Sequence, residues 1–178
     1  MDDPNNSFEH RYSAEKVSDE KLNHYNEVRS ESETIYKTFG KVKCPALGNK
    51  YVTFTSEGFN HLVYRIKKQE RDKRVQIMRF ELLSKAKALI EITSTIQEYE
   101  EYHRQHKVMK SKRNQMINVK IRDIGFVGII KGFRIKVVLR KIGDGGEWKF
   151  HSVIPAWSTQ YYRDIKIIRN TKDNVTDS

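Results

Sequence analysis

The sequence predicts an α+β fold, a single domain in which N-terminal helices pack on a four-stranded antiparallel β-sheet. Two observations indicate this fold: helical periodicity dominates before residue 94, and strand-like segments separated by Gly-rich or basic breaks dominate after it. Helices followed by a meander of strands is the element order of α+β domains. A chain of 178 residues, 37% of them hydrophobic, suffices for one core with tails.

The charge is distributed unevenly along the chain. Residues 1–36 hold nine acidic and four basic residues and few large apolar ones, so we expect an acidic arm that is partly disordered or helical. A basic domain is predicted over residues 37–170 and a polar tail over residues 171–178. After residue 36 there are 30 basic and 14 acidic residues, a net charge of +16, which indicates a polyanionic partner.

The first elements of the basic domain are predicted from local patterns. Residues 50–55 alternate apolar and polar side chains and predict a strand, and Ser56 offers an N-cap for a helix over about residues 57–67. A longer amphipathic helix is predicted over residues 70–92, because its apolar residues recur at steps of three and four. These apolar residues are Val75, Met78, Leu82, Ala86 and Leu89.

Four strands are predicted after this helix. They cover residues 96–104, 117–129, 133–141 and 148–154, with an exposed basic loop at residues 107–113 and a Gly-rich hairpin turn at residues 143–146. A row of carboxylates, Glu98, Glu100 and Glu101, falls on the first of them. We expect these carboxylates to be solvated or paired with Lys and Arg rather than catalytic.

The last two strands can be aligned by matching their faces. With Leu139 opposite Phe150 and Val137 opposite Ser152, one face is apolar and the other is basic. The basic face then carries Arg134, Lys136, Arg140, Lys149 and His151. A slip of one residue, which a bulge in the Gly-rich turn could produce, would instead put Ser152 on the basic face. Both His151 and Ser152 therefore stay candidates for a phosphate site, although alternating bases on a strand are also typical of a solvated sheet face.

His61 lies near the start of the first helix, directly after a predicted strand. The dipole at a helix N-terminus favours neutral imidazole, which suits a general base near pH 7. Arg65, four residues further, shares the helix face of His61 and can hold a phosphate. A partly buried packing histidine is the alternative explanation of His61.

No cofactor and no metal ion is expected. The only cysteine is Cys44, the pair His103 and His106 lacks further ligands, and no P-loop, GxGxxG, GxSxG or HExxH motif is present. No apolar run reaches the roughly 18 residues of a membrane span, and the N-terminus lacks a signal-peptide pattern. We therefore expect no membrane partner and a cytoplasmic location, or delivery into a target cell's cytoplasm without a cleavable signal peptide.

Short motifs of this chain occur together in one known superfamily. They are TSEGFNH at residues 55–61, LIEI at 89–92, IKVVLRK at 135–141 and FHSVIPAW at 150–157. Over residues 38–160 the chain thus resembles the phage-type nucleases of the barnase, EndoU, colicin and RelE-like superfamily. The resemblance implies a toxin-like, metal-independent endoribonuclease that cleaves RNA by 2′-hydroxyl transesterification. It further implies that RNA, including tRNA or other structured RNA, is the substrate and that an acidic immunity or antitoxin protein is a possible partner.

The resemblance assigns roles to individual residues. His61 matches the helical histidine, Lys136 and Arg140 the basic strand residues, and Ser152 the hydroxyl residue of the last core strand. His151 rests on the strand alignment alone, as the acid for the leaving oxygen. The residues expected to bind RNA are Arg65, Arg134, Lys149 and Trp157.

Two functions without catalysis compete with the nuclease. The first is a nucleic-acid-binding module that follows phosphates with its basic residues and stacks bases on aromatic side chains. The second is an adaptor whose basic surface binds an acidic protein, including its own arm at residues 1–36, in which case deletion of the arm raises RNA affinity.

Overall fold

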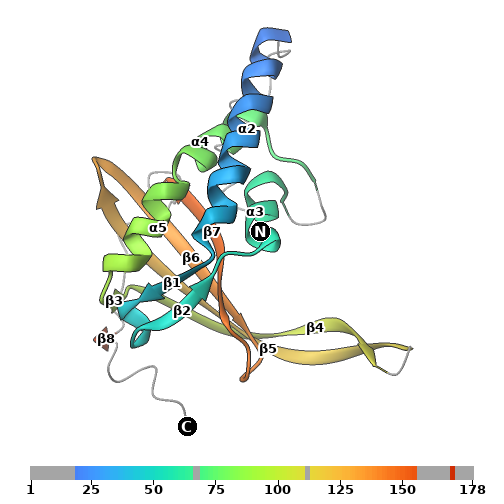
Figure 1. The fold of residues 1–178 in the computed structure, drawn as a ribbon. Coiled ribbons are helices and arrows are strands. Elements are labelled where there is room, and N and C mark those ends of the chain that lie inside the picture. Colours follow the sequence, from blue (N-terminus) through green and yellow to red (C-terminus); the bar gives the residue numbers. More distant parts are fainter. Residues whose placement is uncertain (1–18, 66–68, 111–112, 156–168, 171–178) are drawn as a thin grey trace, which may run out of the picture.

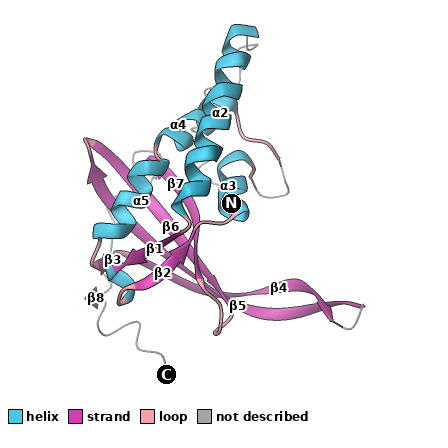
Figure 2. Ribbon diagram, in the orientation of Figure 1, coloured by secondary structure: helices cyan, strands magenta, loops and turns pink. Residues whose placement is uncertain are grey.

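The computed structural model describes residues 19–65, 69–110, 113–155 and 169–170. The α-helices in this part of the chain are α2 (Asp19–Phe39), α3 (Ser56–Val63), α4 (Lys73–Glu81) and α5 (Leu83–Ile92). The strands are β1 (Lys41–Cys44), β2 (Lys50–Thr53), β3 (Thr95–Ile96), β4 (Glu98–Lys110), β5 (Arg113–Ile130), β6 (Phe133–Ile142), β7 (Trp148–Pro155) and β8 (Arg169–Asn170). Figure 1 shows the helices gathered on one side of a twisted sheet, and Figure 2 separates helices from strands by colour. No helix in these residues is both long and apolar enough to cross a membrane.

The α+β class and the single domain agree with the prediction, whereas the predicted four antiparallel strands are part of a larger, mixed sheet. The main sheet has six strands in the order β1-β2-β7-β6-β5-β4. Strands β4 to β7 form the predicted antiparallel meander, and β2 then pairs with β7 in parallel, through Val52 with Trp148 and Thr53 with Lys149. Strand β1 was not predicted, although Lys41–Cys44 alternates exposed and buried residues, because four residues are the minimum length for a strand pattern.

The helix predicted over residues 70–92 is two helices with a turn at Leu82, where the Leu82 N–H donates to the Arg79 carbonyl at 3.2 Å. The predicted apolar stripe is largely buried, including Val75, Ala86 and Leu89. Helix α5 lies close to β5, because a Cβ at Gly128 would come within 2.7 Å of a Leu89 methyl carbon. These helices cover the sheet face that carries Ile135, Val137 and Leu139.

Helix α2 includes residues 19–36 of the predicted acidic arm and belongs to the core. Tyr25 and Tyr36 are 2% and 3% exposed. The Tyr36 ring contacts a cluster of four phenylalanines: Phe39, Phe54, Phe59 and Phe150. Deletion of residues 1–36 would therefore remove core side chains, so it cannot serve as a test of autoinhibition. Residues 1–18 and the predicted tail at 171–178 lie outside the described residues.

The predicted basic loop at residues 107–113 is wrong. Strands β4 and β5 stay paired from Glu98 opposite Gly125 to Lys110 opposite Arg113, so the two strands continue through most of this segment. Figure 1 shows the resulting two-stranded projection extending beyond the rest of the sheet.

Candidate functional site

A β-bulge at His151 shapes the sheet face opposite the helices. Near the turn Leu139 pairs with Phe150, as the first alignment predicts, whereas further along Val138 pairs with Ser152, as the slipped alignment predicts. Each alignment therefore holds for half of the hairpin. The irregularity lies in the middle of β7 and not in the Gly-rich turn, so His151 is the extra residue. Bulges re-aim side chains and are common beside active sites.

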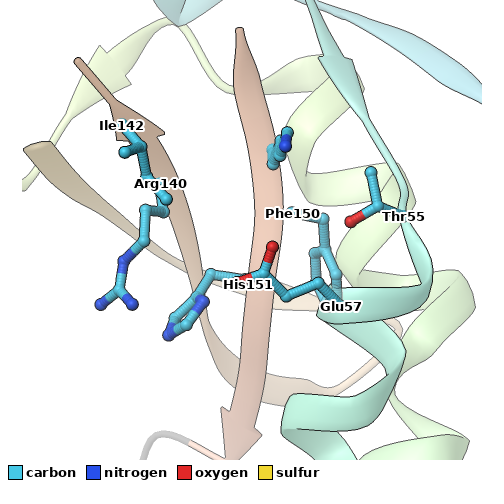
Figure 3. A pocket seen from close by; sticks show the side chains of 8 residues that line it. Thr55, Glu57, Arg140, Ile142, Phe150 and His151 are labelled. Atoms are coloured by element: carbon cyan, nitrogen blue, oxygen red, sulfur yellow. The ribbon is translucent and has the colours of Figure 1, made fainter. Parts of the chain in front are cut away.

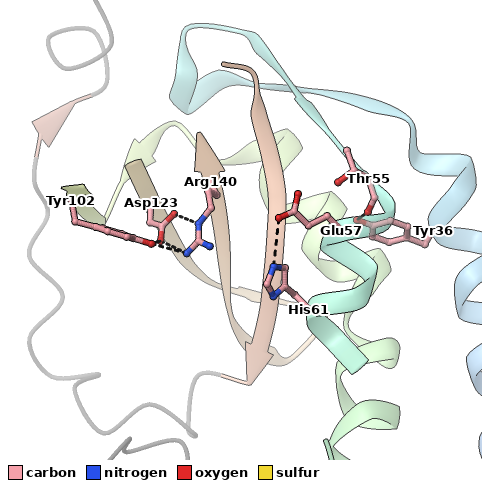
Figure 4. A network of polar contacts seen from close by, with 7 residues as sticks. All are labelled: Tyr36, Thr55, Glu57, His61, Tyr102, Asp123 and Arg140. Atoms are coloured by element: carbon pink, nitrogen blue, oxygen red, sulfur yellow. Dashed lines mark hydrogen bonds and ion pairs between the residues drawn. The ribbon is translucent and has the colours of Figure 1, made fainter. Parts of the chain in front are cut away.

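Helix α3 brings His61 to this bulge. The two imidazole ring centroids of His61 and His151 are 4.0 Å apart. The close approach depends on Gly58, because a Cβ at that position would come within 2.5 Å of the Phe150 carbonyl oxygen. Glu57, one turn before His61 on α3, has a carboxylate oxygen 3.9 Å from His61 Nε2 (Figure 4).

Both histidines are held in the neutral form. Burial and then the positive charge of Arg140 lower the pKa of His61, and the His61 side chain is still 36% exposed, so a substrate can reach it. Burial, Arg140 and His61 lower the pKa of His151 to about 2. A neutral His61 fits the predicted general base. A general acid must carry a proton, so the predicted acid role of His151 is not supported.

Arg140 is fixed by a bidentate ion pair. Its Nε and Nη2 donate to the two carboxylate oxygens of Asp123 at 2.7 Å each, and Nη2 also donates to the Tyr102 hydroxyl at 3.0 Å. Figure 4 shows this group across β7 from His61. The side chains of Arg140 and Asp123 are 18% and 14% exposed, so solvent screens the pair weakly.

The face predicted to be basic is therefore compensated by carboxylates. Lys136 is paired with Glu98, as Arg140 is with Asp123. The pairing of Glu98 with Lys136 agrees with the expectation that this carboxylate is solvated or paired with Lys and Arg. The pairing of Arg140 with Asp123, which lies opposite it on β5, was not predicted. The partners of Lys136 and Arg140 come from strands that the alignment of the last hairpin did not include.

Two depressions meet at the Arg140–Asp123 pair. The first, shown in Figure 3, is lined by Thr55, Glu57, Gly58, Arg140, Ile142, Lys149, Phe150 and His151. The second, of about 410 Å³, is lined by Glu98, Tyr99, Glu100, Asp123, Ile124, Gly125, Lys136 and Val138. The first has a volume of only about 10 Å³, enough for about one water molecule, so a phosphate group fits only the second.

Ser152 is held by an arginine that the sequence did not single out. Arg79 is 5% exposed, and its Nη1 donates to Ser152 Oγ at 3.0 Å and to the Val153 carbonyl at 3.4 Å. Its Nε has no hydrogen-bond partner among the described residues, and burial together with Arg71 and Arg65 lowers its pKa to about 9. Arg79 fixes β7 just after the bulge. The sequence did not predict this contact, because Arg79 lies in an amphipathic helix among several other basic residues.

The remaining predicted residues are spread more widely. Lys149 lines the first depression, whereas Arg134 is exposed near the start of β6, opposite Ile129. The Arg65 guanidinium lies near Arg79, and Trp157 is outside the described residues. In the described part of the chain, no three His, Cys, Asp or Glu residues are grouped so that they could hold a metal ion.

No family model, no curated protein and no solved structure matches the chain. The resemblance to the barnase, EndoU, colicin and RelE-like nucleases stays a prediction.

Proposed function

We propose that the chain is a metal-independent endoribonuclease that cleaves RNA by 2′-hydroxyl transesterification. One observation carries this proposal: a neutral, accessible histidine, His61, touches His151 at a β-bulge and lies beside the immobilised Arg140. The net charge of +16 after residue 36 favours an RNA substrate, and equally an acidic immunity or antitoxin protein as a partner.

In the proposed reaction His61 removes the proton of a ribose 2′ hydroxyl, and the oxygen attacks the adjacent phosphorus. The bond from phosphorus to the 5′ oxygen breaks and leaves a 2′,3′-cyclic phosphate. Lys149 lines the same depression, and its ammonium group is the proposed source of the proton that the 5′ oxygen takes up.

Arg140 stabilises the charge that develops on the phosphoryl oxygens. Among the described residues its bonds to Asp123 and Tyr102 use Nε and Nη2, which leaves the Nη1 hydrogens for a phosphate. A donor fixed before the reaction does not have to reorganise, which is the basis of oxyanion stabilisation. His151 acts as a positioning residue that orients His61, and Ser152 and Lys136 have no acid or base step.

The test compares His61→Ala with a matched control, His24→Ala, which removes an exposed histidine of α2. Each protein is incubated with labelled single-stranded RNA and with DNA of the same sequence, in excess EDTA. We expect cyclic-phosphate products from RNA only, a rate lowered about 10² to 10⁴-fold by His61→Ala, and no change with His24→Ala. If the RNA stays intact and the native chain and both variants bind it equally well, the nuclease hypothesis is wrong. The chain is then a non-catalytic nucleic-acid-binding module.

A further inference from the structure

The two-stranded projection of β4 and β5 has no neighbour in the main sheet. Residues 103–110 and 113–120 pair only with one another in eight residue pairs, whereas β5 begins to pair with β6 at Ile121. We call these residues the basic ribbon. At about 3.4 Å per residue, eight pairs extend about 27 Å from the sheet.

The basic ribbon carries charge of one sign. Residues 103–120 contain six Lys or Arg residues and no Asp or Glu. They are Arg104, Lys107, Lys110, Lys112, Arg113 and Lys120. Lys120, at the base, pairs with Glu101 and lies 3.9 Å from Asp144. The outer part has no acid of its own, in contrast to the compensated sheet face.

The composition of the basic ribbon distinguishes between kinds of polyanion. Single-stranded nucleic acids are held by aromatic side chains on which the bases stack. Residues 103–120 contain no Phe, Tyr or Trp, and their ring-bearing side chains are those of His103 and His106, so charge outweighs stacking in the ribbon. Charge alone fits the regular phosphate rows of a double helix, where Lys and Arg release counterions.

We propose that the basic ribbon binds the phosphate backbone of a double-stranded stem in the RNA that the His61 site cleaves. The inference rests on the proposed function for the identity of the nucleic acid. It specifies the substrate class of the proposed nuclease: a structured RNA in which a double-stranded stem adjoins an unpaired segment.

The base of the basic ribbon connects the two sites. Tyr102 precedes the ribbon directly, and its hydroxyl bonds to both Arg140 and Asp123 (Figure 4). Arg122, on β5 just inside the ribbon, donates to Glu101 and to Asp144 of the β6–β7 turn at 3.0 and 2.6 Å. A stem held along the ribbon therefore places the adjoining unpaired nucleotides over the depression that contains Arg140 and His151.

The experiment measures binding rather than cleavage, so that it is separate from the test of the nuclease. All proteins carry His61→Ala, and the ligands are an RNA duplex, a single strand of the same length and a DNA duplex. The ribbon variant combines Arg104→Gln, Lys107→Gln, Lys110→Gln and Arg113→Gln. The control variant removes four exposed lysines elsewhere, with Lys37→Gln, Lys41→Gln, Lys43→Gln and Lys50→Gln.

For the RNA duplex we expect the slope of log K against log salt to become shallower by about 3 in the ribbon variant, since each lost phosphate contact removes about 0.7 to 0.9. When salt is raised from 50 to 200 mM, both proteins lose affinity for the RNA duplex. The loss factor of the ribbon variant should be about 60 times smaller than that of the protein without the ribbon substitutions. Unchanged circular dichroism and thermal unfolding establish that the variant folds. If it does not fold, the double variant Arg104→Gln with Lys107→Gln is measured instead, and half of the slope change is expected.

Three outcomes overturn the proposal. Equal slope changes in the ribbon and control variants would mean that the ribbon is not a specific contact. Loss confined to the single strand would exclude the stem, and loss confined to the DNA duplex would exclude RNA as the ligand. Absence of RNA cleavage by the native chain would refute the nuclease alone and leave the measured ribbon contact standing.

Discussion

The neutral His151 makes stability depend on pH in a way that can be measured without knowing the substrate. The folded chain holds the pKa of His151 at about 2, whereas an unfolded histidine has a pKa of about 6.5. Between these values the unfolded chain binds a proton that the folded chain does not. Stability therefore falls as pH falls below 6.5, and the histidine has little effect above pH 7.

The magnitude follows from proton linkage. From pH 6 to pH 5, one histidine that stays neutral in the folded state lowers the free energy of unfolding by about 1.2 kcal/mol. His61, whose pKa is also lowered, adds a contribution of the same sign. Urea unfolding at pH 6 and pH 5 measures the loss for the native chain and for His151→Gln, which cannot titrate. The variant should lose about 1.2 kcal/mol less between the two pH values.

Comparing the losses of the two proteins between pH 6 and pH 5 removes the contribution of the carboxylates, because they titrate in both proteins. It also removes any change in packing that does not depend on pH. An equal loss in native chain and His151→Gln would show that His151 is protonated normally, and the argument for a desolvated histidine pair at the bulge would then be wrong.

Three further substitutions probe the packing and charges around the site. Asp123→Asn should lower the free energy of unfolding by about 2 to 3 kcal/mol in urea, because it leaves Arg140 charged and mostly buried, and a second change, Arg140→Gln, should restore part of the loss. Arg79→Met should lower the melting temperature, because it leaves the Ser152 hydroxyl and the Val153 carbonyl without the Arg79 donor. Gly58→Ala should cost about 1 to 3 kcal/mol by calorimetry, because its Cβ would overlap the Phe150 carbonyl.

The sequence predicted the elements whose patterns are long and local. Strands β4 to β7 and helices α3 to α5 follow from alternation and from steps of three and four. The parallel pairing of β2 with β7 was not predictable, because it joins residues almost 100 positions apart through only two register pairs. The expected arm was partly disordered or helical, and residues 19–36 are helical. Composition could not show which side chains dock this polar helix on the core, here Tyr25 and Tyr36.

For the candidate site, the sequence identified the residues more reliably than their roles. It selected His61, His151 and Arg140, which the structure brings together. It could not show that Arg140 is paired with Asp123, because the pairing depends on the register between β5 and β6. Nor could it show that His151 is desolvated, since that follows from the packing of α3 on β7.

The distribution of charge separates binding from chemistry. At the site, Arg140 and Lys136 are each matched by a carboxylate and His61 is neutral, so the site itself attracts a polyanion weakly. The basic ribbon carries five Lys or Arg residues and no acid in its sequence. Substitutions on the ribbon should therefore change mainly the apparent affinity and its salt dependence, whereas His61→Ala should change mainly the rate of the bound complex. A kinetic study in which both kinds of variant altered the same parameter would contradict this separation.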